Sequence, residues 1–253
     1  EGFRRGQPNG VVAANGGQSL VNPLDPAIIP VSAAGDSLWN YEAGAKLKLF
    51  DDLVQANFAA YLIKWTDMQI PLVRTSDQAP YAGNIGEAQS IGLEGEIFAR
   101  ASENIELGFN FQVQDSEVTQ ISAGQALISG ALKGSSLASP DVKIGVFGKA
   151  TWSLGDLGDV FVRVDAQHVG SYPNAFPNTP GAGTLSPTYA TIPSYEKVDA
   201  SLGWRGDTFG LTLYVENLLD EDTPVFINPA NFSANRYSSL RPRTIGLRMS
   251  YTY

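Results

Sequence analysis

Few residues in this chain could carry out acid–base or metal chemistry. His168 is the only histidine and the chain has no cysteine, which leaves too few ligands for a zinc site and one imidazole for catalysis. Glu94 and Glu96 are two residues apart, so on a strand they share a face and could form a carboxylate pair. The acidic run 220–222 could bind Ca²⁺. We interpret the three features as a surface histidine, charges on a wet wall and a solvated strand end. We therefore predict no catalytic residue, metal site, cofactor or enzyme activity.

The elements that must position these residues alternate with a period of two. In residues 105–113 every second residue is apolar, and the residues between are polar or glycine. Successive strand side chains point to opposite faces, so this segment predicts a strand with one apolar and one polar side. The pattern recurs at 41–49, 54–62, 91–100, 142–152, 160–167, 197–205, 209–216 and 245–253. Strands of roughly 9–11 residues are what a tilted membrane-spanning strand needs.

The connections between these segments alternate in length. Short ones, with the Gly, Asp and Asn of tight turns, fall near 51–52, 102–104, 155–158 and 206–207. Long ones cover roughly 6–37, 70–83, 118–140, 172–193 and 221–239. This sorting puts the tight turns at one end of the strands and the long loops at the other, as in transmembrane barrels.

Charge and aromatic positions indicate which face meets lipid. A Lys or Arg facing the middle of a bilayer costs about 2–4 kcal/mol, and the charges on the apolar parity all lie beside long loops: Lys64, Glu87, Glu196, Arg241 and Arg243. Aromatic rings favour the two membrane interfaces. We predict such positions for Trp39 and Tyr41 at the long-loop end, and at the short-turn end for Trp152, Trp204, Phe209, Tyr251 and Tyr253.

The predicted fold class is therefore all-β, an antiparallel up-and-down transmembrane β-barrel. The charged fraction of 17% is low beside the roughly 25% of soluble domains. A net charge of −9 argues against a nucleic-acid partner. A soluble β-sandwich, whose inner face is also apolar, stays open as an alternative that membrane fractionation would separate.

Several stretches resemble one family of membrane proteins. Residues 2–9 are similar to a GFR-x-G-x-x-N stretch, 39–46 to NYE-x-G-x-K, 53–69 to the hairpin arm that follows, and 88–96 to G-x-E-x-E. Residues 214–220 are similar to V-x-N-L-F-D, with Leu219 in place of Phe, and 241–247 to R-P-R-x-x-G. In this order they resemble the late barrel strands of TonB-dependent outer-membrane receptors.

The resemblance implies a 22-stranded barrel with an N-terminal plug and a periplasmic TonB box. Residues 1–253 are then expected to be the C-terminal portion of that barrel, a partial barrel of about nine or ten strands without plug or TonB box. Such a piece alone would have two open edges and is expected not to transport. Expected partners are outer-membrane lipid, the TonB complex through the missing N-terminal region, the barrel-assembly machinery through the last strand, and a bulky small-molecule ligand.

The function implied is TonB-dependent uptake of a bulky ligand, foremost a ferric siderophore, in the outer membrane of a Gram-negative bacterium. A passive porin-like channel is the alternative. Ligand contacts are expected from the long loops, where Arg can grip acidic groups and aromatic rings offer flat surfaces. The candidate residues are Arg74, Tyr81, Tyr172, Phe176, Tyr189, Phe232 and Arg236.

Overall fold

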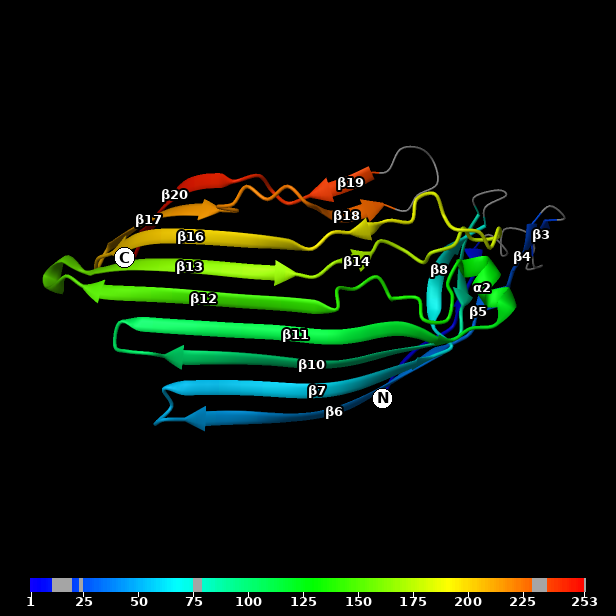
Figure 1. Cartoon of the computed structure of the whole chain (residues 1–253), viewed down its shortest axis with the longest axis horizontal. Coiled ribbons are helices and arrows are strands. Elements are labelled where there is room, and N and C mark those ends of the chain that lie inside the picture. The colour runs from blue at the N-terminus through cyan, green and yellow to red at the C-terminus, as the bar shows by residue number, and fades with distance from the viewer. Residues whose placement is uncertain (11–19, 23–24, 75–78, 229–235, 253) are drawn as a thin grey trace.

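One large antiparallel sheet forms the body of the protein (Figure 1). The computed structural model describes residues 1–10, 20–22, 25–74, 79–228 and 236–252, and the side chains of residues 20–28 are outside this description. The ten strands of the sheet, in spatial order, are β1 (Gly2–Arg4), β6 (Asp36–Leu49), β7 (Val54–Thr66), β10 (Glu87–Arg100), β11 (Ile105–Gln120), β12 (Val142–Ser153), β13 (Asp159–Val169), β16 (Tyr195–Arg205), β17 (Phe209–Glu216) and β20 (Thr244–Tyr251).

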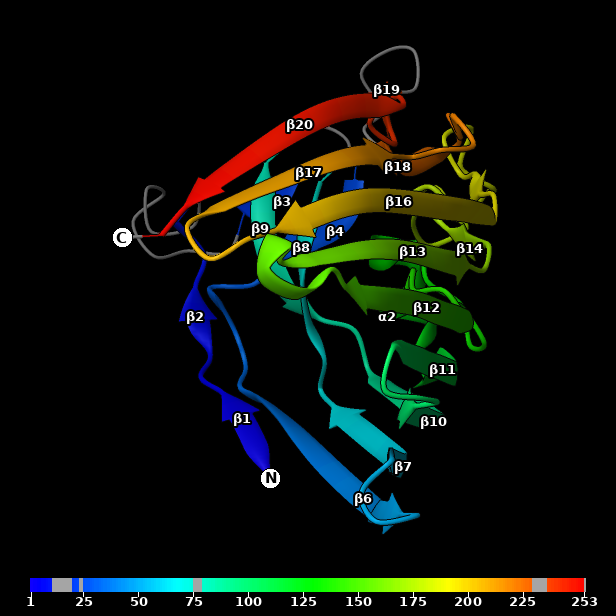
Figure 2. The ribbon, with the colours of Figure 1, turned by 90° about the vertical axis from the view of Figure 1, so that its left-hand side faces the viewer.

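The sheet curves into an open trough whose long strands lie beside their sequence neighbours (Figure 2). Every segment predicted as a strand is a strand, and the short turns all lie at one end. The partial, unclosed barrel is thus confirmed. Strand lengths differ from the prediction at both extremes, because β17 and β20 have 8 residues whereas β11 has 16 and continues beneath the long loops. In the described residues no helix is long and apolar enough to span a membrane.

Packing at the loop end identifies the inner face of the trough. Ala88 and Val118 belong to the polar parity of β10 and β11, and both are buried against Leu72 and Tyr81 of a loop hairpin. Figure 2 shows that hairpin inside the trough. The polar parity therefore faces inward and the apolar parity faces outward.

The outward side chains are large, apolar and exposed. Leu93 in β10, Leu202 in β16 and Leu247 in β20 are 45%, 50% and 62% exposed. A soluble sandwich would bury such residues in a dry centre. Their exposure along the outer face excludes that alternative and matches a lipid-facing surface.

The register of the sheet shows how far the strands lean. One hydrogen-bonded row joins Leu49 at the short-turn end of β6 to Ile245 at the loop end of β20. All members of the row are on the outward parity. The row thus climbs from one end of the trough to the other, as the tilt and stagger of barrel strands require.

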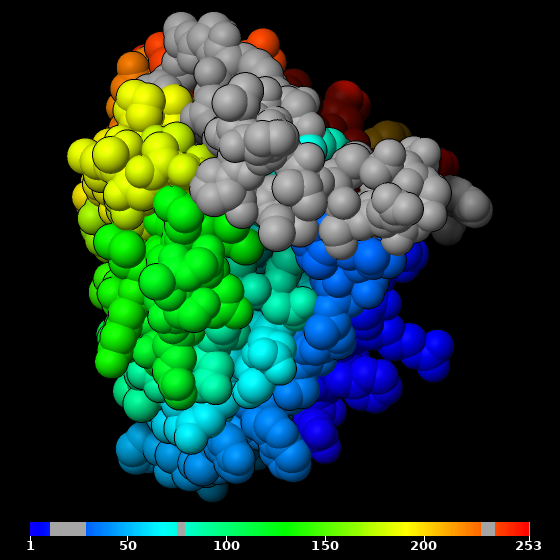
Figure 3. Space-filling view, turned by 90° about the vertical axis from the view of Figure 1, so that its right-hand side faces the viewer, coloured from blue at the N-terminus to red at the C-terminus, as the bar shows by residue number. Residues whose placement is uncertain are grey.

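The described parts of the long loops contain regular structure. They carry the hairpins β2 (Gln7–Pro8) with β5 (Ser32–Ala33), β3 (Leu20–Asn22) with β4 (Asp25–Ile29), β8 (Gln69–Val73) with β9 (Pro80–Asn84), β14 (Tyr172–Pro173) with β15 (Thr191–Ile192) and β18 (Pro224–Asn228) with β19 (Arg236–Ser239), and the helix α2 (Ala123–Ser129). We call the loop segments 5–35, 67–86, 121–141, 170–194 and 217–243 together the loop cap. Figure 3 shows described parts of the cap packed side by side at this end.

The hydrophobic core lies at the loop end, where the loop cap packs on Ala88 of β10 and Val118 of β11. Ile29, Met68 and Ile85 are at most 1% exposed and pack with Ala131 and residues of the hairpin β8–β9. The sheet has no dry interior, because in the part of the chain that the structure describes no second sheet packs against its apolar face. Among the described residues, buried apolar side chains therefore gather in a cluster between the loops and the loop ends of β10 and β11.

The turn between β6 and β7 is strained. Phe50, Asp51 and Asp52 follow one another with φ of 55°, 54° and 66°. A left-handed conformation costs an L-residue other than glycine roughly 1–2 kcal/mol.

Asp51→Gly is expected to stabilise the barrel by about 1 kcal/mol, because glycine tolerates this conformation. Urea unfolding of a full-length barrel containing this chain, in lipid vesicles, measures the change. Asp156→Gly is the control, since Asp156 lies in a short turn of the same end without a positive φ. Equal effects of both substitutions would contradict the strain.

Leu93→Lys is expected to destabilise the barrel in vesicles by about 2–4 kcal/mol, because it places a charge on the lipid-facing surface. Glu94→Lys, one residue further on and facing the trough, should cost much less. If the two substitutions destabilise the barrel equally, the outward orientation of Leu93 toward lipid is contradicted.

Candidate functional site: the inner wall and the loop cap

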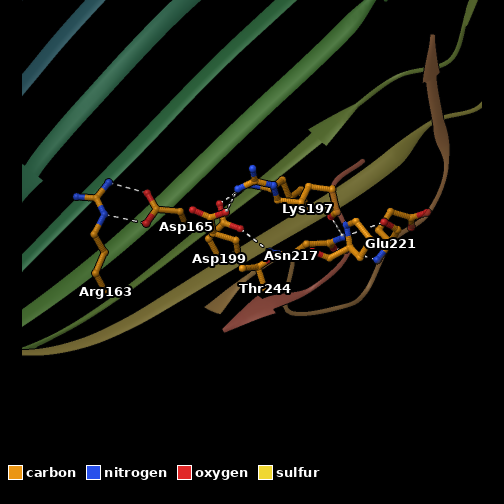
Figure 4. Close-up of polar contacts among 10 residues, drawn as sticks. Arg163, Asp165, Lys197, Asp199, Asn217, Glu221 and Thr244 are labelled. Atoms are coloured by element: carbon orange, nitrogen blue, oxygen red, sulfur yellow. Dashed lines mark hydrogen bonds and ion pairs between the residues drawn. The ribbon is translucent and has the colours of Figure 1, made fainter. Parts of the chain in front are cut away.

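Ion pairs line the inner wall between β11 and β16. Lys149 lies 3.5 Å from Glu106, and Lys197 lies 2.6 Å from Asp199. Figure 4 shows the third pair, in which Arg163 donates twice to Asp165. The members are about one quarter to two fifths exposed, so water screens them and each pair stabilises the protein little. The wall is polar but locally neutral.

Amide and hydroxyl groups line the wall between β7 and β11. Asn57 donates to Glu96 at 2.6 Å. Tyr61 donates its hydroxyl to Gln114 at 3.0 Å and accepts from Gln112 at 3.2 Å. Glu96 therefore has a structural partner, and the Glu94–Glu96 pair belongs to this wet wall, as the sequence analysis interpreted it.

Aromatic rings lie flat across glycines on the inner wall. A Cβ on the glycine would come within 2.1–2.3 Å of the ring in three pairs: Phe147 across Gly108, Phe161 across Gly203, and Tyr214 across Gly246. Arg163 stacks on Phe147 at 4.2 Å, which adds a cation–π attraction. The glycines let these rings lie against the wall instead of projecting into the trough.

A polar knot fixes the start of the hairpin β8–β9 to the wall. The buried carboxylate of Asp36 accepts two bonds from Arg4, one from Trp65 Nε1 at 2.8 Å and one from the Gln69 N–H at 3.1 Å. Arg4 also donates to the Gln69 carbonyl at 2.7 Å and lies 5.7 Å from the Trp65 ring. Charge-assisted bonds of this kind are the strong ones, so the knot holds β1, β6, β7 and β8 together.

A second knot closes the turn after β17. Asn217 is 1% exposed with φ of 53°, and Figure 4 shows it beside Asp199 and Glu221. Its side chain donates to the carbonyls of Glu221 and Arg241 at 2.8 and 2.9 Å and accepts from the Glu221 N–H. Its backbone N–H donates to Asp199 at 2.8 Å. Asparagine suits this place because it tolerates the left-handed conformation and bonds nearby backbone.

The acidic run after β17 serves the same turn. Asp220 accepts from the Arg243 backbone N–H at 2.9 Å. The Thr223 hydroxyl, followed by the Thr223 N–H, lowers the pKa of the Glu221 carboxyl. Across the described residues, no group of three or more acidic or histidine side chains is arranged to hold a metal ion.

Three of the predicted ligand-contact residues are partly or wholly covered in the loop cap. Arg74 and Tyr81 lie on or beside the hairpin β8–β9 and are 4% and 6% exposed. Phe176 packs against the same cluster as Tyr81. These side chains support the cap, and in this arrangement Arg74 and Tyr81 offer almost no surface to a solute.

The other predicted contacts lie in the loops after β13 and β17. Tyr189 and Arg236 are exposed, and the half-buried Tyr172 donates its hydroxyl to the Val225 carbonyl at 3.0 Å. That bond ties the two loops to each other. Phe232 lies outside the described residues. The structure thus divides the candidates into two groups instead of bringing all of them together.

His168 lies on the outward parity, beside a long loop. Its Nδ1 is 2.8 Å from a carboxylate oxygen of Glu196. Glu196 was predicted on this parity and is in place beside its loop. The pair adds to the polar rim above the apolar surface, and in the described part of the chain it belongs to no group of three or more acidic or histidine side chains that could hold a metal ion.

The predicted interface aromatics are exposed on the outer face. Trp39 and Tyr41 stack with ring centroids 6.2 Å apart at the loop end, and Phe209 and Tyr251 lie 5.2 Å apart at the turn end. Trp152 and Trp204 are also exposed at the turn end. Tyr253 lies outside the described residues. Their contact with the membrane interface remains a prediction.

Sequence reasoning missed Arg4, Asp36, Gln69 and Asn217 as site residues. Arg4, Gln69 and Asn217 belong to the stretches that resemble the receptor family, so a polar residue near the end of such a stretch was the available signal. Asp36 carried none, because its partners Arg4 and Gln69 lie 32 and 33 residues away in the chain.

Asn217→Ala is expected to destabilise the barrel by about 3 kcal/mol, because it removes three part-buried hydrogen bonds to backbone groups, each worth roughly 1 kcal/mol, and strains the turn. Urea unfolding in vesicles measures the loss. Asn40→Ala, which removes only a weak exposed bond to Glu42, is the control. A loss below about 1 kcal/mol for Asn217→Ala would refute the knot.

Several proteins of known structure have a similar fold. The fold is similar to the ferric yersiniabactin uptake receptor FyuA from Yersinia pestis, with a TM-score of 0.70 and 20% identity over 98% of this chain and 33% of that chain. The ferric-catecholate import receptor Fiu from E. coli K12 matches with 0.62 and 19% over 86% and 27%, and the copper transporter OprC with 0.64 and 14% over 87% and 31%. The chain spans about a third of the length of these proteins or less.

No curated protein matches the chain in sequence. A family model does: the TonB dependent receptor-like β-barrel matches residues 1–218. Proteins of this family are receptors and transporters of the Gram-negative outer membrane and not enzymes. With most of its length matched and the open trough of tilted, outwardly apolar strands described above, this chain belongs to the TonB-dependent receptor β-barrel family.

Proposed function

We propose that this chain is a barrel segment, 1–253, of an outer-membrane receptor that imports a bulky ligand, foremost a ferric siderophore. The observation that carries the proposal is the loop cap. Four of its five loop segments, all but 217–243, contribute to one buried apolar cluster at the end of a trough whose inner wall is polar. A structured cap of this kind suits selective capture of a solute better than free diffusion.

The proposed sequence of events starts at the loops. Tyr189 and Arg236 are exposed there and can contact an incoming ligand, Arg through charge-assisted bonds and Tyr through its flat ring. The locally neutral wall lets a solute pass without strong binding to any one charge. Energy comes from the TonB complex acting on a plug and TonB box in the remainder of the receptor.

The other proposed partners follow from the surfaces of the sheet. Lipid covers the outward apolar face, and the barrel-assembly machinery recognises the last strand, β20, with its outward Met249 and Tyr251. The edge strands β1 and β20 pair with further strands of the same receptor.

Two observations support a ferric siderophore as the ligand class. FyuA and Fiu, with folds similar to this chain, are named for ferric yersiniabactin and ferric catecholates. The exposed loop residues are an arginine and aromatics, which suit a flat, acidic chelate. OprC, which has the same fold, is named for copper, so the fold alone leaves the ligand open and the loops must decide it.

Uptake of radioactive iron supplied as a panel of ferric siderophores tests the proposal in cells that express a full-length receptor containing this chain. Arg236→Ala and Tyr189→Ala should each raise the KM for one siderophore roughly tenfold, as loss of one charge-assisted bond or one aromatic contact predicts. Arg100→Ala is the control, because Arg100 lies at the short-turn end of β10, away from the loops. It should leave uptake unchanged. Uptake that persists without TonB and admits unrelated small solutes would establish the porin-like alternative.

A further inference from the structure

The hairpin β18–β19 lacks the apolar support that the other loops have. Of the five loop segments, 217–243 alone contributes no described residue to the buried apolar cluster. The knot around Asn217 joins only the two ends of this segment, at Glu221 and Arg241. The hairpin carries the exposed Arg236. It therefore needs another support if Arg236 is to keep one position.

The loop after β13 is anchored at its far end. The Asn178 N–H donates to the Gly130 carbonyl at 3.0 Å, and the Gly181 N–H donates to the Leu127 carbonyl at 2.7 Å. These bonds join the loop to the helix α2 and its C-cap. Phe176 of the same loop packs against the buried apolar cluster. This loop is thus a fixed body on which a less supported hairpin can rest.

Two side chains of the anchored loop hold the hairpin. The Tyr172 hydroxyl donates to the Val225 carbonyl at 3.0 Å, and Asn174 Nδ2 donates to the Ile227 carbonyl at 3.3 Å. The two donor residues are two positions apart and so are the two acceptors, a spacing that puts groups on the same side of an extended chain. The hairpins β14–β15 and β18–β19 form separate sheets. Among the described residues these side-chain bonds, and not strand pairing, therefore join them.

Asn174 also fixes the backbone on both sides of Tyr189. Its side chain accepts from the Ala190 N–H at 2.9 Å and donates to the Thr188 carbonyl at 2.9 Å. Its own N–H donates to the Ala190 carbonyl at 2.9 Å. One asparagine therefore bonds both chain neighbours of an exposed tyrosine.

The same asparagine reaches the strand that pairs with the region of Arg236. Ile227, whose carbonyl accepts from Asn174, pairs with Tyr237 of β19, the residue next to Arg236. Asn174 thus connects the backbone beside Tyr189 to the hairpin that carries Arg236. Two ligand contacts that are fixed relative to each other bind one ligand more tightly than two mobile ones, because less freedom is lost on binding.

We propose that Tyr172 and Asn174 are positioning residues, which hold the hairpin β18–β19 against the anchored loop so that Tyr189 and Arg236 bind one ligand together. The inference rests on the proposed function, because it takes both exposed side chains as contacts of the imported ligand. It assigns Tyr172 to the support of the site and not to its contact surface.

Spin labels test the support without any ligand, in a full-length receptor that contains this chain. The chain itself has no cysteine that would compete for the label. Leu185→Cys in the anchored loop and Tyr237→Cys in β19 replace side chains that are 67% and 68% exposed. Pulsed electron resonance should give one narrow distance distribution. Tyr172→Phe with Asn174→Ala should broaden it at least about twofold, because the hairpin can then leave the loop.

Two controls show whether the broadening is local. Labels at Leu185→Cys and Leu132→Cys, which lie on two anchored loops, should keep their distance distribution in the same double variant. Tyr41→Phe should change neither distribution, because the Tyr41 hydroxyl is far from the loop after β13 in the sheet order. Tyr172→Phe alone leaves every bond of Asn174 in place, so it should broaden the first distribution by an intermediate amount without unfolding the loop.

Uptake of radioactive iron as a ferric siderophore, by the unlabelled receptors, links the support to binding. The double variant should raise the KM about tenfold and leave the maximal rate unchanged, because both contact side chains remain. Arg236→Ala should add only about twofold in that background, since the unsupported residue already contributes little. General loss of folded receptor would instead lower the maximal rate and leave the full effect of Arg236→Ala in place.

An unchanged first distance distribution in both Tyr172→Phe and the double variant overturns the proposal, and so do additive effects on the KM. These outcomes are distinguishable from failure of the proposed function. A receptor whose first distribution broadens but that imports no ferric siderophore refutes the import proposal and still confirms the support. A receptor that imports a siderophore with the same KM in wild type and double variant refutes the positioning role alone.

Discussion

Sideways pairing of the backbone is the constraint on which this structure depends. In hydrocarbon an unpaired N–H or C=O costs several kcal/mol, so each strand of the sheet must have neighbours that satisfy it. The long strands from β7 to β17 have neighbours on both sides within the chain, whereas β6 pairs with β1 only over residues 36–38. A sheet that satisfies its backbone in this way is one strand thick, and every second side chain must then suit lipid while the others suit the trough.

The absence of a dry interior in the sheet explains where the rest of the stability lies. Apolar side chains gather under the loops, around Met68, Ile85 and Val118. Buried polar residues fasten the loops to the strand ends, through Asp36 at one place and Asn217 at another. The same loops carry the proposed ligand contacts, so the stability of the cap and the proposed recognition of a ligand depend on the same segments of the chain.

The outer face, the inner wall and the loop cap have different roles. The outer face sets the location of the protein, the inner wall keeps a neutral polar surface, and the cap holds the candidate ligand contacts. Some of those candidates, such as Arg74 and Tyr81, are so deeply buried that they hold the cap together. Others, such as Arg236, remain free to meet a solute at the surface.

Much of the fold could be predicted from local chemistry. The alternation of apolar and polar residues predicted each long strand and its outward, apolar side. Successive side chains of a strand point to opposite faces, so the apolar residues mark one face and the polar residues mark the other. Leu93 and Glu94 show this within two positions, since one faces outward and the next faces the trough. The alternation of short and long connections predicted which end of the strands carries the tight turns. The short connections are recognisable because a tight turn needs residues such as Gly, Asp and Asn.

The candidate site could be predicted only in part, because contacts between distant segments decide it. The residues around Gln69 in the sequence do not predict that the Gln69 N–H donates to Asp36. They also do not predict that the Gln69 amide oxygen has no hydrogen-bond partner among the described residues. The register that carries one row from Leu49 to Ile245 likewise emerges only when the strands pair. The sequence by itself determined which residues face outward, which face the trough and which form turns, since these are properties of single residues and their spacing. Only the tertiary structure decided which loop residues are buried and which are free, because burial depends on what the rest of the chain places against them.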